Sequence, residues 1–214
     1  QNDLFHNGDR SPTLTSQAVD KKVREMMGGS PHLLRTLIHM DAPDHHKYRA
    51  LTQAWFMPQN LKKLEDRIRV IARASVEKMA ARGGECDFVN EVALHFPLHV
   101  IMTILGVPES DEPRMLKLTQ ELFGAEDEDF KRDDDVMAGI IQTVAEFVAY
   151  FDGITADRQA HPTEDLASVI ANGMIEGNPI GHKEQLGYYI IAATAGHDTT
   201  SNSMSGGMHA LISH

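Results

Sequence analysis

Apolar residues recur at three- and four-residue intervals along most of this chain, and this spacing is the strongest constraint on its fold. One such stripe consists of Leu61, Leu64, Ile68, Ile71, Ser75 and Met79. An α-helix places residues three and four apart on one face, so the stripe predicts a long amphipathic helix. No alternating apolar and polar run exceeds a few residues, and no internal repeat is visible. The sequence therefore predicts an all-α fold.

The periodicity divides the chain into three parts. Residues 1–40 carry little of it, and the Gly-Gly and Ser-Pro pairs within 26–32 predict a loop. Residues 41–181 are predicted to form a helical body, interrupted by an acidic, solvated loop over 124–135. Residues 182–214 start a last helix that meets no stop signal. We therefore expect a partial chain, truncated within its long central helix.

Composition excludes several classes of protein. Lys and Arg number 20 against 31 Asp and Glu, a net charge of 20 − 31 = −11, which disfavours a nucleic-acid partner because phosphates require a basic face. No apolar run is long enough to predict a membrane-spanning helix. A single cysteine excludes an internal disulfide and fits a reducing compartment. These features predict a cytoplasmic protein.

The segment 190–203, IIAATAGHDTTSNS, starts as a buried helix and then turns polar. Glycine within a helix costs about 1 kcal/mol relative to alanine, and threonine hydroxyls compete for backbone carbonyls. Gly196, Thr199 and Thr200 therefore predict a weakened hydrogen-bond ladder. One interpretation is a groove in which Asp198 and Thr199 form a proton relay. The other is close helix packing through small residues, with Asp198 exposed; the residues alone favour this second interpretation.

Three further groups of residues carry polar or reactive side chains. His45 and Arg49 share one helix face and could clamp an anionic group, although the residues alone favour ordinary capping and a surface ion pair. His95 and His99 have the same spacing, but no third ligand is placed near them, so core or surface histidines are favoured over a metal site. Cys86 has acidic neighbours and no partner cysteine, which argues against a nucleophile.

Two of these patterns occur together in a recognisable order. AGHDTT at 195–200 matches the Ala/Gly-Gly-x-Asp/Glu-Thr-Thr motif of the cytochrome P-450 family. DAPDHHKYR at 41–49 and FMP at 56–58 match two further motifs of its bacterial members. From about Leu4 to its end the chain resembles this family, and most closely its soluble bacterial α-terpineol monooxygenase subgroup.

The resemblance implies a role for each patterned residue. Asp198 and Thr199 would be catalytic, delivering protons for O₂ cleavage. The residues implied to contact haem b are His45, Arg49, Ala195 and Gly196: the first two hold the propionates, and the last two leave room for O₂. The residues implied to line the substrate pocket are Ile38, Leu122, Phe123, Ile191 and Thr194.

One part of the family pattern is missing. The Phe-x-x-Gly-x-x-x-Cys loop that supplies the axial thiolate has no match, nor has the Glu-x-x-Arg helix, and Cys86 stands elsewhere in the pattern. The thiolate supplies the electron push for O–O cleavage. We therefore expect no metal ligand in this chain, which would be about the middle half of an enzyme and inactive alone.

The resemblance implies a haem-dependent monooxygenase that hydroxylates a small apolar, terpenoid-like substrate. It implies electrons from NAD(P)H, passed through a reductase and an iron–sulfur ferredoxin. Two alternatives stay open at this point. One is a non-catalytic helical protein that binds a partner through its apolar stripes, and the other is the product of a degraded gene that does not fold.

Overall fold

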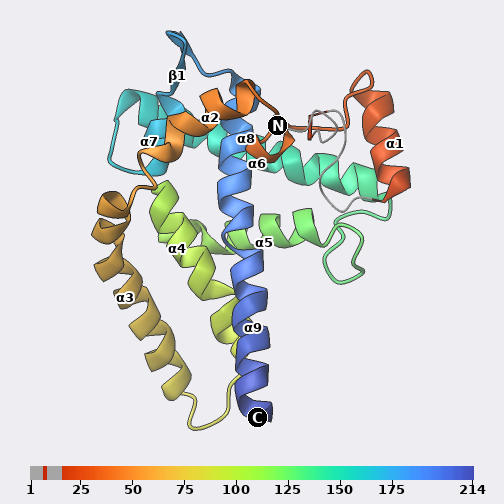
Figure 1. Ribbon diagram of the computed structural model, residues 1–214. Coiled ribbons are helices and arrows are strands. Elements are labelled where there is room, and N and C mark those ends of the chain that lie inside the picture. The colour runs from red at the N-terminus through yellow and green to blue at the C-terminus, as the bar shows by residue number, and fades with distance from the viewer. Residues whose placement is uncertain (1–6, 9–15) are drawn as a thin grey trace.

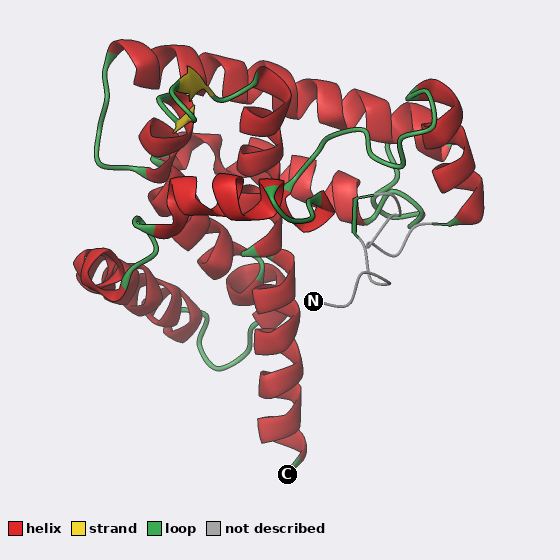
Figure 2. Ribbon diagram, turned by 45° about the horizontal axis from the view of Figure 1, so that its top comes forward, coloured by secondary structure: helices red, strands yellow, loops and turns green. Residues whose placement is uncertain are grey.

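The structure is a computed structural model that describes residues 7–8 and 16–214. Within these residues it is built from helices, as predicted (Figures 1 and 2). The helices are α1 (Gln17–Met26), α2 (Asp44–Gln53), α3 (Pro58–Ala80), α4 (His95–Leu105), α5 (Glu112–Phe123), α6 (Val136–Ala160), α7 (Leu166–Ala171), α8 (His182–Ala195) and α9 (Asp198–Ser213). None of these helices is both long and apolar enough to cross a membrane. Leu4, where the resemblance begins, lies outside the described residues.

Short elements connect the helices. Two 3₁₀ turns, η1 (Leu37–His39) and η3 (Glu109–Asp111), and one π-helical turn, η2 (Val89–Ala93), precede α2, α5 and α4 respectively. The only strands in the described part are β1 (Met174–Ile175) and β2 (Asn178–Pro179), an antiparallel pair between α7 and α8. Sheet structure therefore contributes little to this fold.

The helix α1 corrects the prediction of a loop region over residues 1–40. Ser16 caps its first turn by accepting a hydrogen bond from the Val19 amide, a signal that the sequence does contain. Val23 is the only buried residue of α1, so the apolar periodicity that predicts helices is nearly absent there. The predicted loop after Met26 is present, with Gly28 and Gly29 at positive φ.

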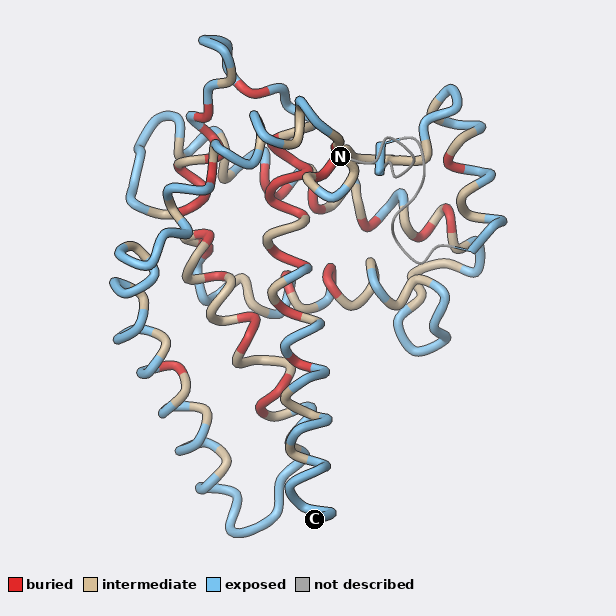
Figure 3. The backbone as a smooth tube through the Cα atoms, viewed as in Figure 1, coloured by how far each residue is buried: buried red, intermediate tan, exposed pale blue. Residues whose placement is uncertain are grey.

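The core lies where α4, α6, α7 and α8 meet (Figure 3). Phe151 of α6 and Tyr189 of α8 are fully buried and stack with ring centroids 4.6 Å apart. The Tyr189 hydroxyl also donates to the Ala167 carbonyl at 3.1 Å, which ties α8 to α7. A buried hydroxyl with a partner avoids the cost of desolvation, so the pair fixes α8 within the body.

The helix α3 and the end of α9 extend away from this core (Figures 1 and 3). Pro58 occupies the first turn of α3, as predicted, because its fixed φ and missing N–H suit that position. Of the predicted α3 stripe only Ile71 is buried, and Leu61 is 40% exposed. On α9, Leu211 and Ile212 are exposed as well. Both helices therefore present apolar side chains that no described residue covers.

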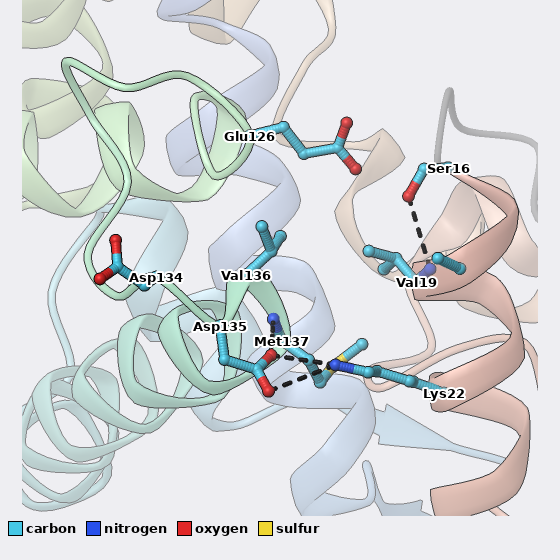
Figure 4. Close-up of a pocket in the computed structure, with 9 residues that line it drawn as sticks. Ser16, Val19, Lys22, Glu126, Asp134, Asp135, Val136 and Met137 are labelled. Carbon is cyan, nitrogen blue, oxygen red and sulfur yellow. Dashed lines mark hydrogen bonds and ion pairs between the residues drawn. The ribbon is translucent and has the colours of Figure 1, made fainter.

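The acidic segment after α5 is a loop, as predicted, and it borders an open pocket of about 580 Å³ between α1 and the start of α6 (Figure 4). Asp135 caps α6 by accepting from the Met137 amide at 3.0 Å. The same carboxylate receives the Lys22 ammonium of α1 at 3.1 Å. One side chain thus caps the start of α6 and attaches α1 to it.

Candidate functional site

The predicted weak point in the last helix is a break between α8 and α9. Helical structure stops at Ala195, and Gly196 and His197 form a turn before α9 starts at Asp198. The His197 amide donates to the Thr194 carbonyl at 3.2 Å, only three residues back, and the regular four-residue bond resumes with Ser201. The segment predicted as one helix from residue 182 is therefore two helices joined by a turn.

One side of the break packs tightly against α4. A Cβ atom on Gly196 would lie 2.2 Å from the Cδ1 atom of Ile101, so no larger residue fits there without displacing Ile101. The ring of His197 is almost fully buried, with Nε2 2.9 Å from the Leu94 carbonyl oxygen. On this side the packing interpretation of the small residues is correct: Gly196 faces the neighbouring helix.

The opposite side of the break is exposed. Ala195 and Thr199, four residues apart, are both exposed there, and Thr200 is exposed as well. The Thr199 hydroxyl donates to the Ala195 carbonyl at 2.8 Å, and the Ser203 hydroxyl donates to the Thr199 carbonyl at 2.8 Å. These bonds hold the hydroxyls of Thr199 and Ser203, four residues apart, on one face of the helix. Ala195, rather than Gly196, supplies the small exposed side chain at the break.

Asp198 is the first residue of α9 and is half-buried. Its Oδ2 atom accepts a hydrogen bond from the Asn202 side chain at 3.3 Å. The positive end of a helix dipole stabilises an anion at this position. A carboxylate and a hydroxyl on consecutive residues are thus present at the break, as the relay interpretation requires.

His45 and Arg49 lie on one face of α2, half-buried and exposed respectively. Neighbouring cations on this surface are neutralised: Arg35 contacts Asp44 at 2.8 Å, and Lys47 contacts Glu176 at 2.7 Å. No ion pair to Arg49 is found within the described part of the chain. The surface ion pair that could have explained this residue is therefore not observed.

The helix α2 is attached to the same long segment that carries the break. The Tyr188 hydroxyl of α8 donates to the Tyr48 carbonyl of α2. Burial raises the pKa of Tyr188, so the hydroxyl keeps its proton for this bond. Tyr188 precedes Gly196 by eight residues, about 12 Å along a helix. The His45–Arg49 face and the break are thus anchored to one helix.

The residues predicted to line the substrate pocket come from three elements. Ile38 lies in η1, Leu122 and Phe123 end α5, and both elements pack against α8, which carries Ile191 and Thr194. Ile38 and Phe123 are exposed, whereas Thr194 is buried and its hydroxyl donates to the Ile190 carbonyl at 2.7 Å. The Thr194 hydroxyl is therefore engaged within its own helix.

The two histidines of α4 share a partner that the sequence did not reveal. Glu112, at the start of α5, contacts His95 Nδ1 with one oxygen and His99 Nε2 with the other, the latter at 2.6 Å. Burial acts to raise the pKa of Glu112, but the contacts with His99 and His95 outweigh it and hold the pKa below its usual value. No group of three or more His, Cys, Asp or Glu side chains among the described residues is arranged to hold a metal ion. The cluster joins α4 to α5.

Comparison with known proteins agrees with the motifs. No model of a protein family matches the chain. Cytochrome P450-terp of a Pseudomonas species is 45% identical over 97% of the chain and 50% of its own length. The crystal structure of CYP108D1 from Novosphingobium aromaticivorans superposes with a TM-score of 0.81 at 46% identity, over 92% of this chain and 46% of that one. This chain belongs to the cytochrome P450 family.

More distant members of the family are similar too. A steroid C26-monooxygenase of Mycolicibacterium smegmatis is 31% identical to this cytochrome P450 chain over 82% of its residues and 40% of the relative. The chain spans about half the length of the curated relatives that it matches. Within that span lie the break between α8 and α9 and the His45–Arg49 face of α2.

Proposed function

We propose that this chain is the oxygen-activating part of a haem-dependent monooxygenase. The complete enzyme inserts one atom of O₂ into a C–H bond of a small apolar substrate. Electrons come from NAD(P)H through a reductase and an iron–sulfur ferredoxin in the cytoplasm. The observation that carries the proposal is the break itself, which presents Ala195 and Thr199 on an open surface while its other side is closed by α4.

The residues present fit haem b. Arg49 carries a planar guanidinium with no ion-pair partner in the described chain, and His45 lies one turn away on the same face. A guanidinium and an imidazole offer nitrogen donors that match the carboxylates of the haem propionates. Bound haem supplies the redox chemistry of O₂, with a thiolate ligand that these residues do not provide. Ala195 is small enough to leave room beside it.

The chain's own contribution is to move a proton. Thr199 holds its hydroxyl proton toward the Ala195 carbonyl, at the exposed surface. When Thr199 gives up that proton at the exposed surface, its oxygen would take a proton from the Asp198 side, and Asp198 would be reprotonated from solvent. Each group gains and loses one proton, so the relay returns to its starting state.

A terpenoid-like substrate is supported by the pocket residues and by the similarity to Cytochrome P450-terp. Ile38, Leu122, Phe123 and Ile191 offer apolar side chains, and such walls suit small hydrocarbons. The test is to supply the complete enzyme with ¹⁸O₂, its electron donors and a panel of terpenoid alcohols. We expect one labelled oxygen atom in the product. An enzyme that binds no haem and labels nothing would instead support a helical interaction protein.

A further inference from the structure

His197 occupies the variable position of the AGHDTT motif, and neither the motif nor the proposed relay gives it a role. Its ring is 1% exposed, and Nε2 lies 2.9 Å from the Leu94 carbonyl oxygen. A carbonyl only accepts, so the ring must carry its proton on Nε2. Burial lowers the pKa of His197, which favours the neutral ring. The Nδ1 atom has no hydrogen-bond partner among the described residues.

Leu94 stands where the π-helical turn η2 passes into α4. Its amide donates to the Val89 carbonyl, five residues back, at 3.0 Å. π-turns interrupt regular helices and are frequent at functional sites. The bond from His197 therefore connects two irregular backbone segments, the break after α8 and the turn before α4.

The backbone angles at the break do not by themselves prevent a continuous helix. Gly196 has φ −82° and ψ −18°, and His197 has φ −89° and ψ −70°, values near the ordinary helical region. A small rotation would restore a continuous helix. Two contacts oppose such a rotation. The Ile101 side chain packs against Gly196, and the His197 ring bonds to the Leu94 carbonyl.

We infer that His197 is a positioning residue whose hydrogen bond to the Leu94 carbonyl keeps the break open and keeps Thr199 directed to the exposed surface. The catalytic purpose of this positioning rests on the proposed function. The hydrogen bond from His197 to Leu94 does not depend on that function. Because His197 and Gly196 fix the closed side of the break, Ala195 and Thr199 are left on the opposite side. Removing the bond leaves the partly buried Leu94 carbonyl without this partner and loosens α9 against η2.

Hydrogen exchange of the Ser201 amide, in the complete protein, tests the positioning role directly. Ser201 is buried and its amide donates to the His197 carbonyl at 3.0 Å, so it reports on the first turn of α9. We expect His197→Leu to speed its exchange about tenfold. His197→Gln, which can donate to the same carbonyl, stays close to the wild type. His209→Leu, at an exposed histidine of the same helix, is the control.

If His197→Leu does not fold, His197→Asn replaces it, because asparagine is polar but too short to reach Leu94. Equal exchange in wild type and the Leu or Asn variant overturns the inference, as does equal acceleration in the Gln variant. A second readout is the share of electrons lost as hydrogen peroxide, which rises in the Leu or Asn variant and not in the Gln variant. A wild-type enzyme without any oxygenated product contradicts the proposed function, while the exchange rates still decide the role of His197.

Discussion

The Thr199 hydroxyl donates to the Ala195 carbonyl at 2.8 Å across the break between α8 and α9. This single bond does two things. It engages the carbonyl of the last residue of α8, and it holds a proton-bearing oxygen on the exposed side of the helix.

Thr199→Ala in the complete enzyme should divert electrons from product to hydrogen peroxide, because the relay loses its hydroxyl. A general acid–base group of this kind contributes about 10²- to 10⁴-fold, so product formation should fall by at least the lower figure. Product and peroxide are measured together against cofactor consumed. Thr200→Ala is the matched control, since Thr200 is equally exposed and makes no side-chain hydrogen bond to another described residue. Unchanged product and peroxide formation in Thr199→Ala would contradict the relay role of Thr199.

Arg49→Leu should weaken haem retention, because the proposed partner of its guanidinium is a propionate. Loss of a charge-assisted hydrogen bond predicts about tenfold faster haem release. Transfer of haem to an excess of an acceptor apoprotein gives the rate. Lys47→Met removes a cation from the same helix that is already paired with Glu176, and should leave the rate unchanged. Identical rates in the two variants would contradict the assignment of Arg49.

Gly196→Ala should destabilise the fold by about 1–3 kcal/mol, the usual cost of overpacking. The added methyl group meets Ile101 Cδ1, which Ile101→Val removes, so the double variant should recover part of the loss. Urea unfolding measures both. Gly206→Ala, on the exposed side of α9 with open space around its Cβ position, should instead stabilise by about 0.5–1 kcal/mol. A cost at Gly196 that Ile101→Val does not change would mean that another contact explains the glycine.

Glu112 should make the stability of the fold depend on pH in the acid range. Its folded pKa lies below the unfolded value of about 4.3, so the ionised group stabilises the fold above that value. This stability is lost as the pH falls through the folded pKa. Glu112→Gln should therefore flatten the unfolding free energy between about pH 5 and pH 3. Glu109→Gln is the control and should keep the wild-type slope, because Glu109 lies on an exposed surface with its nearest cation, Arg67, at 3.8 Å. If Glu109→Gln also lost the slope, the pH dependence would come from general surface charge.

Local sequence patterns predicted most of the helices. Pro58 marks the start of α3 because proline suits a first helical turn, and the apolar period follows from 3.6 residues per turn. The polar interruption at 195–200 predicted the weakened ladder for the same reason, since the preferences of glycine and threonine act within one turn. The helix α1 was missed because one buried valine gives no period to detect.

Spacing along a helix tells which residues share a face, but not what that face meets. The sequence placed His95 and His99 one turn apart, yet only the packing of α5 against α4 supplies Glu112 as their common partner. Likewise Gly196 and Ala195 look equivalent in the motif. Only the structure shows that Gly196 packs against Ile101 while Ala195 is exposed. Short-range backbone preferences thus determined where the last helix breaks. Which side of the break is exposed was decided by contacts between segments about a hundred residues apart. No local sequence pattern records such contacts.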